Sequence, residues 1–193
     1  MALTGRLLSL NVARAEAIVV DGRRVMTGFG KRPVEGLRSV GPIGVEGDEQ
    51  ADLSVHGGPS KAVYAYPSEH YPFWQTVRAQ AGVAAWDEPL APGALGENLT
   101  LAGVVEHQVF IGDLLRFPGC VLAVSEPRTP CFKLDAAMGF QHASKLMAKS
   151  AWCGWYLAVR VPGAIAAGET FEVIPGSREV GIGELFRARM GRP

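Results

Sequence analysis

The chain has 193 residues, of which 48% are hydrophobic and 20% are charged, and its formal net charge is zero. This composition is typical of a globular protein with a sizeable core and excludes a disordered chain. A neutral balance also argues against a general nucleic-acid-binding protein, because such proteins usually carry a basic excess.

The 24 glycines and 13 prolines favour many short strands joined by turns. In chain order, the patterns predict strands at residues 6–12, 15–20, 23–29, 61–66, 97–101, 113–117, 120–126, 154–161 and 170–174. They predict helices at residues 67–82, 135–151 and 181–190. No strand–helix alternation indicates a Rossmann fold, so we expect a mainly β protein, a β-barrel with a few peripheral helices.

The cysteines are Cys120, Cys131 and Cys153, and their odd number without a C-x-x-C pair argues against a disulfide framework or a structural zinc site. A reducing cytoplasm is the compartment that this usage favours. No apolar run approaches the roughly 18 residues of a membrane helix. Asn11 and Arg14 interrupt the first apolar stretch, which favours a strand over a secretory signal.

One cysteine stands between cations, in the segment "SEPRTPCFKLD". Its two prolines disfavour an ordinary helix or a central strand, and in an extended segment Cys131 and Lys133 point to the same face. Arg128 and Lys133 stabilise a thiolate, which is the reactive and metal-binding form. A functional thiol and a buried strand residue remain equally open at this point. Cys120 and Cys153 lie in apolar runs and are expected to be core thiols.

The loop "HGGPSK" brings together His56, Gly57 and Lys61. Glycine lets backbone N–H groups approach an oxyanion or a phosphate, and Lys61 supplies a positive charge. The alternative is a β-turn with a capping histidine.

Two further stretches could complete a ligand pocket. Asn98 in "GENLT" can donate and accept, as the edge of a heterocycle requires, although asparagine is also common in turns. Lys31 and Arg32 could face an anionic ligand or form a solvated hairpin tip. Aromatic residues that could shape a substrate mouth, or belong to the core, are Tyr66, Tyr71, Trp74 and Trp86.

Together, the motifs "GDEQAD", "HGGPSKAV", "YPSEHY", "GENL" and "EPRTPCFKL" resemble, in order and spacing, those of MOSC-domain proteins. This family is named for the C-terminal domain of molybdenum cofactor sulfurase. The similarity runs from about Thr27 to about Pro175 and is strongest to the YiiM-like branch, the 6-hydroxylaminopurine-resistance proteins. It implies a single MOSC domain over residues 1–193, with a β-barrel core at about 5–175 and a short C-terminal helix at about 178–190.

The resemblance also implies binding of the molybdenum cofactor, with Cys131 as a ligand to molybdenum, since a soft thiolate suits this metal. The residues placed around the pterin and its phosphate are Lys31, Arg32, His56, Gly57, Lys61, Asn98, Arg128 and Lys133. We expect His56 to act as a general acid.

The implied activity is the reduction of N-hydroxylated compounds, including N-hydroxylated purine bases. No flavin, haem or iron–sulfur motif is visible, so electrons would come from a separate reductase. No pyridoxal phosphate, nucleic acid or membrane partner is expected, and a homodimer is left open. Many YiiM-like proteins carry a C-terminal helical extension, which the sequence to Pro193 does not include.

Two alternatives remain. The chain could carry the molybdenum cofactor or sulfur without turnover of its own. It could also be a nucleophilic enzyme that pairs Cys131 with His56, although no orienting acid stands out.

Overall fold

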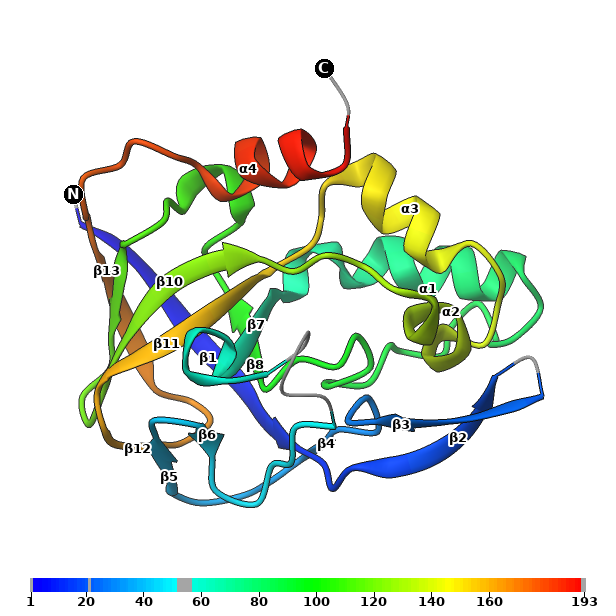
Figure 1. Ribbon diagram of the computed structural model, residues 1–193, viewed down its shortest axis with the longest axis horizontal. Helices are drawn as coiled ribbons and strands as arrows, with labels where there is room; N and C mark the ends of the chain where they lie inside the picture. The colour runs from blue at the N-terminus through cyan, green and yellow to red at the C-terminus, as the bar shows by residue number, and fades with distance from the viewer. Residues whose placement is uncertain (1, 21, 52–56, 192–193) are drawn as a thin grey trace.

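The computed structural model describes residues 2–20, 22–51 and 57–191. Its main sheet has the strand order β13-β9-β10-β11-β7-β8-β1-β4, and pairing of β13 with β1 closes it into a barrel of seven strands, with β4 added at one edge (Figure 1). The barrel strands are β1 (Leu3–Val12), β7 (Val63–Pro67), β8 (Leu99–Ala102), β9 (Leu114–Arg116), β10 (Val121–Pro127), β11 (Trp155–Val161) and β13 (Thr170–Ile174). Only the β7–β8 pair is parallel within this described barrel.

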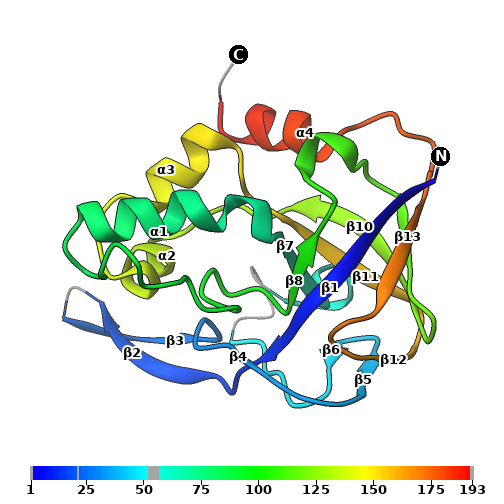
Figure 2. The ribbon, with the colours of Figure 1, turned by 180° about the vertical axis from the view of Figure 1, so that it is seen from behind.

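Four helices surround the barrel: α1 (Tyr71–Gln80), α2 (Phe132–Met138), α3 (Ala143–Ser150) and α4 (Ile182–Arg189). The first three gather at one side of the barrel, and α4 lies against β10 (Figures 1 and 2). Smaller strands are the hairpin β2 (Glu16–Val20) and β3 (Arg23–Thr27), then β4 (Arg32–Pro33), β5 (Arg38–Gly41), β6 (Gly44–Val45) and β12 (Gly163–Ile165). Single turns of 3₁₀-helix are η1 (Pro59–Lys61), η2 (Ser68–His70) and η3 (Glu106–Gln108). The β2–β3 hairpin extends away from the barrel, past α2.

The barrel interior follows from strand alternation. In β13, Phe171 and Val173 are buried while Thr170 is exposed, as expected for a sheet with one face toward the core. Gly5 in β1 is required by a close approach, because a Cβ atom there would lie 2.4 Å from the Phe171 ring. Apolar side chains from all seven barrel strands form one continuous core.

The expected β-barrel with peripheral helices is confirmed. The single helix predicted at residues 135–151 is wrong, because two helices, α2 and α3, occupy this region. Gly139 ends α2 in the left-handed region, with φ of 80°. The Asp135 carboxylate then accepts hydrogen bonds from the backbone N–H of His142 (3.2 Å) and Ser144 (2.7 Å), which fixes the start of α3.

The extended conformation expected from Cys131 to Lys133 is also wrong. Cys131 is extended, but α2 begins at Phe132, two residues after Pro130. The short strands β4, β5, β6 and β12 were not predicted, because two to four residues carry no readable alternation. None of the helices in the described ranges is long and apolar enough to cross a membrane.

Candidate functional site

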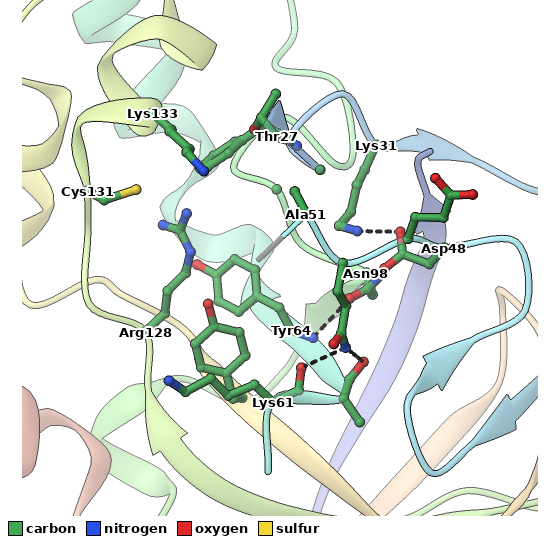
Figure 3. Close-up of a pocket in the computed structure, with 17 residues that line it drawn as sticks. Thr27, Lys31, Asp48, Ala51, Lys61, Tyr64, Asn98, Arg128, Cys131 and Lys133 are labelled. Carbon is green, nitrogen blue, oxygen red and sulfur yellow. Dashed lines mark hydrogen bonds and ion pairs between the residues drawn. The ribbon is translucent and has the colours of Figure 1, made fainter. Parts of the chain in front are cut away.

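A cavity is lined by the residue that follows β10, by residues at the start of β7 and β11, and by the loop before β8 (Figure 3). Its empty volume, including solvent at the mouth, is about 610 Å³. The described residues that line it are Thr27, Gly28, Phe29, Lys31, Asp48, Glu49, Gln50, Ala51, Lys61, Ala62, Tyr64, Gly96, Asn98, Arg128, Cys131, Lys133 and Tyr156. The fold therefore joins segments that are far apart in the sequence.

Cys131 presents its thiol at this cavity. The residue is the N-cap of α2, with extended dihedral angles, and is half-buried. Within the described ranges, no group of three or more His, Cys, Asp or Glu side chains stands together as metal ligands. Cys120 and Cys153 are buried, which confirms both as core thiols, and burial raises the pKa of Cys120 to about 12.

Arg128 brings a buried positive charge to the same cavity. The residue is 4% exposed, and its guanidinium lies 4.8 Å from the ring centre of Phe29 and 5.0 Å from that of Tyr64. One of its nitrogens is 3.9 Å from the Met147 sulfur. None of the ion pairs among the described residues gives it a carboxylate partner. A buried cation without a counter-charge is costly in the absence of a ligand, so Arg128 makes the cavity suited to an anion.

Lys31 reaches the cavity already paired. Its Nζ forms an ion pair with the Asp48 carboxylate, and both side chains are nearly buried. Burial lowers the pKa of Lys31, and the neighbouring Asp48 opposes this effect. Gly93 allows the loop before β8 to approach Lys31 closely. Its φ is 86°, and a Cβ atom there would lie 2.6 Å from the Lys31 carbonyl oxygen.

Lys61 and Lys133 come from opposite walls. The Lys61 Nζ lies 3.8 Å from Glu126 Oε1 and 5.8 Å from the ring centre of Tyr156. The Lys133 Nζ donates to the Met26 carbonyl oxygen at 2.7 Å, which ties α2 to the β2–β3 hairpin. Both cations line the same cavity as the thiol, but each also contacts a protein partner.

Asn98 lines the cavity mainly as a structural residue. Its Oδ1 accepts a hydrogen bond from the Tyr64 N–H at 3.0 Å, and its Nδ2 donates to the Asn11 carbonyl oxygen at 3.1 Å. The side chain thereby joins strands β7 and β1 beside the start of β8. Its amide is directed at the backbone, and the role we expected at a heterocycle edge remains a prediction.

Among the described residues, two predicted site residues do not join this group. Arg32 is exposed on β4 and lines a separate surface hollow, because successive residues of an extended segment point to opposite sides. Gly57 is buried but is not among the described lining residues. His56, proposed as general acid, lies outside the described residues.

The cavity residues that were not predicted from the sequence include Asp48, Phe29, Tyr64 and Tyr156. Asp48 lies within a recognised motif, but the two tyrosines occupy strands whose alternation does not separate barrel core from cavity wall. The aromatic residues suggested as a mouth serve elsewhere: Tyr66 and Trp74 are fully buried, Tyr71 bonds to Glu97, and Trp86 is 66% exposed.

Comparison with known proteins shows which family and which relatives the chain resembles. Residues 52–172 match the MOSC domain family. The chain is 38% identical over 184 residues to the uncharacterized protein YflK of Bacillus subtilis, covering 95% of this chain and 79% of that one. It is 34% identical to protein YiiM of Escherichia coli, covering 80% of this chain and 66% of that one. It is also 31% identical to a protein named reductase from Gibberella moniliformis, covering 96% of this chain but 33% of that one.

The fold agrees with these matches. The crystal structure of YiiM from Geobacillus stearothermophilus superposes with a TM-score of 0.76 at 28% identity, covering 96% of this chain and 84% of that one. Sequence and fold lead to one conclusion: the chain belongs to the MOSC-domain family, in its YiiM-like branch.

Proposed function

We propose that this chain binds the molybdenum cofactor in the cavity, with Cys131 as the protein ligand to molybdenum. We further propose that it reduces N-hydroxylated compounds, such as N-hydroxylated purine bases, to the corresponding amines. Membership of the MOSC family and a relative named reductase support an oxidoreductase.

The observation that carries the proposal is that a thiol and a buried cation line the same cavity. Cys131 and Arg128 line one cavity, and Arg128 has no carboxylate partner among the described residues. Molybdenum with sulfur ligands suits a thiolate, and a pterin phosphate suits a buried cation. The donor set therefore fits an anionic, sulfur-ligated metal cofactor.

The remaining cavity residues have roles that follow from their chemistry. Lys31, Lys61 and Lys133 would add positive potential around an anionic cofactor. The rings of Phe29 and Tyr64 offer flat apolar surfaces against which a planar heterocycle can pack. Gly96 lets the Phe29 ring pack closely against the loop before β8, because a Cβ atom there would lie 3.0 Å from this ring.

The proposed reaction adds two electrons and two protons to the N-hydroxyl compound and releases the amine and water. The cofactor would supply the two electrons when bound. The protein residues would hold the substrate, limit access of water and provide hydrogen bonds. We propose that a separate reductase renews the electrons, as no redox motif was found in the sequence.

The test is turnover by protein produced in a host that makes the molybdenum cofactor. N-hydroxylaminopurine would be supplied with a reduced viologen dye, and formation of the amine would be followed by chromatography. Cys131→Ser should abolish amine formation, whereas Cys120→Ala, which changes a thiol in the core, should retain it. Amine formation that survives in Cys131→Ser would contradict the proposal. Bound molybdenum without turnover by any reductant would favour a cofactor carrier.

A further inference from the structure

Tyr156 lies in the cavity wall with its neighbours fixed by the sheet. It is the second residue of β11, opposite Tyr64 of β7 on one side and opposite Glu126 of β10 on the other. The Tyr64 and Tyr156 ring centres are 5.4 Å apart, and Tyr156 is 7% exposed. Backbone pairing and ring packing together hold this side chain in place.

The two tyrosines of the cavity differ in where their hydroxyl protons go. The Tyr64 hydroxyl donates to the Cys153 carbonyl oxygen at 2.8 Å. Tyr156 lines the same cavity as Arg128, whose guanidinium carries only donors and therefore cannot accept the Tyr156 proton. No acceptor for the Tyr156 proton is found in the part of the chain that the structure describes. This proton is available to a ligand.

Three other donors of the cavity are directed at protein acceptors. Lys31 bonds to Asp48, Lys133 donates to the Met26 carbonyl oxygen, and the Asn98 amide donates to Asn11. Tyr156 also keeps its proton at neutral pH, since burial raises its pKa although Arg128 opposes this.

We infer that the Tyr156 hydroxyl donates a hydrogen bond to the N-hydroxyl oxygen of the substrate, and that it thereby distinguishes an N-hydroxylated compound from its amine. The inference rests on the function proposed above and names the residue that recognises the N-hydroxyl group of the substrate. The amine product lacks this oxygen, so its binding leaves the Tyr156 proton without an acceptor. The same contact would favour release of the product over the substrate.

The experiment measures binding rather than turnover. Oxidised, cofactor-loaded protein without a reductant would be titrated by calorimetry with N-hydroxylaminopurine and, separately, with the corresponding aminopurine. Tyr156→Phe keeps the ring and removes only the hydroxyl. Tyr66→Phe is the matched control, because its hydroxyl lies in the core between Trp74 and the Trp152 carbonyl oxygen. Molybdenum content would be measured for all three proteins.

We expect Tyr156→Phe to weaken binding of the N-hydroxylated compound by about 3- to 10-fold, the usual effect of one hydrogen bond. Binding of the amine should change less than about 2-fold, and Tyr66→Phe should leave both affinities as in the wild type. Equal weakening of both ligands, unchanged binding of the N-hydroxylated compound, or loss of molybdenum in Tyr156→Phe would overturn the inference while leaving the proposed function intact. Wild-type protein that holds no molybdenum would overturn the proposed function and the inference with it.

Discussion

Two buried polar groups of this protein have opposite surroundings. Glu97 is fully buried, and its carboxylate accepts hydrogen bonds from the Tyr71 hydroxyl, the Gly93 N–H at 2.9 Å, the Leu95 N–H at 3.1 Å and the Thr100 hydroxyl at 3.0 Å. Arg128 is almost as deeply buried, yet its guanidinium contacts two aromatic rings and a methionine sulfur, with no carboxylate partner among the described residues.

The difference separates a group that serves the fold from one that serves a ligand. The protein itself supplies the hydrogen-bond donors for the Glu97 carboxylate, and these bonds fix the loop before β8. Arg128 is held in place by its ring contacts, but its charge is left for something that enters the cavity. Substitutions at these two positions should therefore affect different measured quantities.

The largest change in stability is expected from Glu97→Ala. It leaves two N–H groups and two hydroxyls without their acceptor in a buried site, so the free energy of unfolding should fall by about 3–5 kcal/mol. Urea denaturation of cofactor-free protein measures this. Glu88→Ala is the control, because the Glu88 side chain is 48% exposed and its contact with Arg78 spans 3.5 Å, which predicts a loss of at most about 1 kcal/mol. A Glu97→Ala loss as small as the control would contradict the structural role.

Arg128→Met should change bound molybdenum strongly and the free energy of unfolding only slightly. Methionine keeps the apolar length of the side chain, so the free energy of unfolding of cofactor-free protein should fall by no more than about 2 kcal/mol, the upper range of a cation–π contact. Bound molybdenum should drop by at least about 10-fold, because the loss of one charged hydrogen bond amounts to about 1.5–3 kcal/mol. Stability lost to the extent seen in Glu97→Ala, with metal content retained, would assign Arg128 to the fold.

The smallest effect is in the pH dependence of stability. Burial raises the pKa of Glu97, although its hydrogen bonds oppose this, so the folded state binds the proton more tightly than the unfolded state. The contribution of Glu97 to stability is therefore complete below the ordinary carboxyl pKa and declines as the pH rises through the folded-state value. The free energy of unfolding, measured in urea at pH 4.5 and pH 8, should decrease more for the wild type than for Glu97→Gln. Identical decreases would show that Glu97 does not titrate in this range.

Sequence patterns were sufficient for the barrel. Strand β13 alternates over five residues and its burial follows that alternation, whereas β10 is marked by a continuous apolar run that is buried from Leu122 to Val124. The break between α2 and α3 was harder to predict, because the apolar residues Leu134, Met138 and Leu146 keep helical spacing across it. Gly139 was the available sign, and its left-handed conformation decides the outcome.

For the site, the motifs anticipated that Cys131, Arg128, Lys31 and Lys61 lie together, although spacing along the chain does not set distances in space. What the sequence could not show is how each charge is paired. Lys31 and Arg128 are both basic, but only the fold reveals that Asp48 neutralises the first while the second lacks a carboxylate among the described residues. Tyr156 was missed for the same reason, since a tyrosine in a strand has no sequence feature that marks a free hydroxyl.

The central claim is that Cys131 is a ligand to molybdenum in this cavity. Elemental analysis of protein from a cofactor-producing host tests it directly, with Cys131→Ser and Cys120→Ala prepared beside the wild type. The account predicts close to one molybdenum per chain in the wild type and in Cys120→Ala, and a loss of most of the metal in Cys131→Ser. Equal metal content in the wild type and Cys131→Ser, or no metal in any of the three, would contradict it.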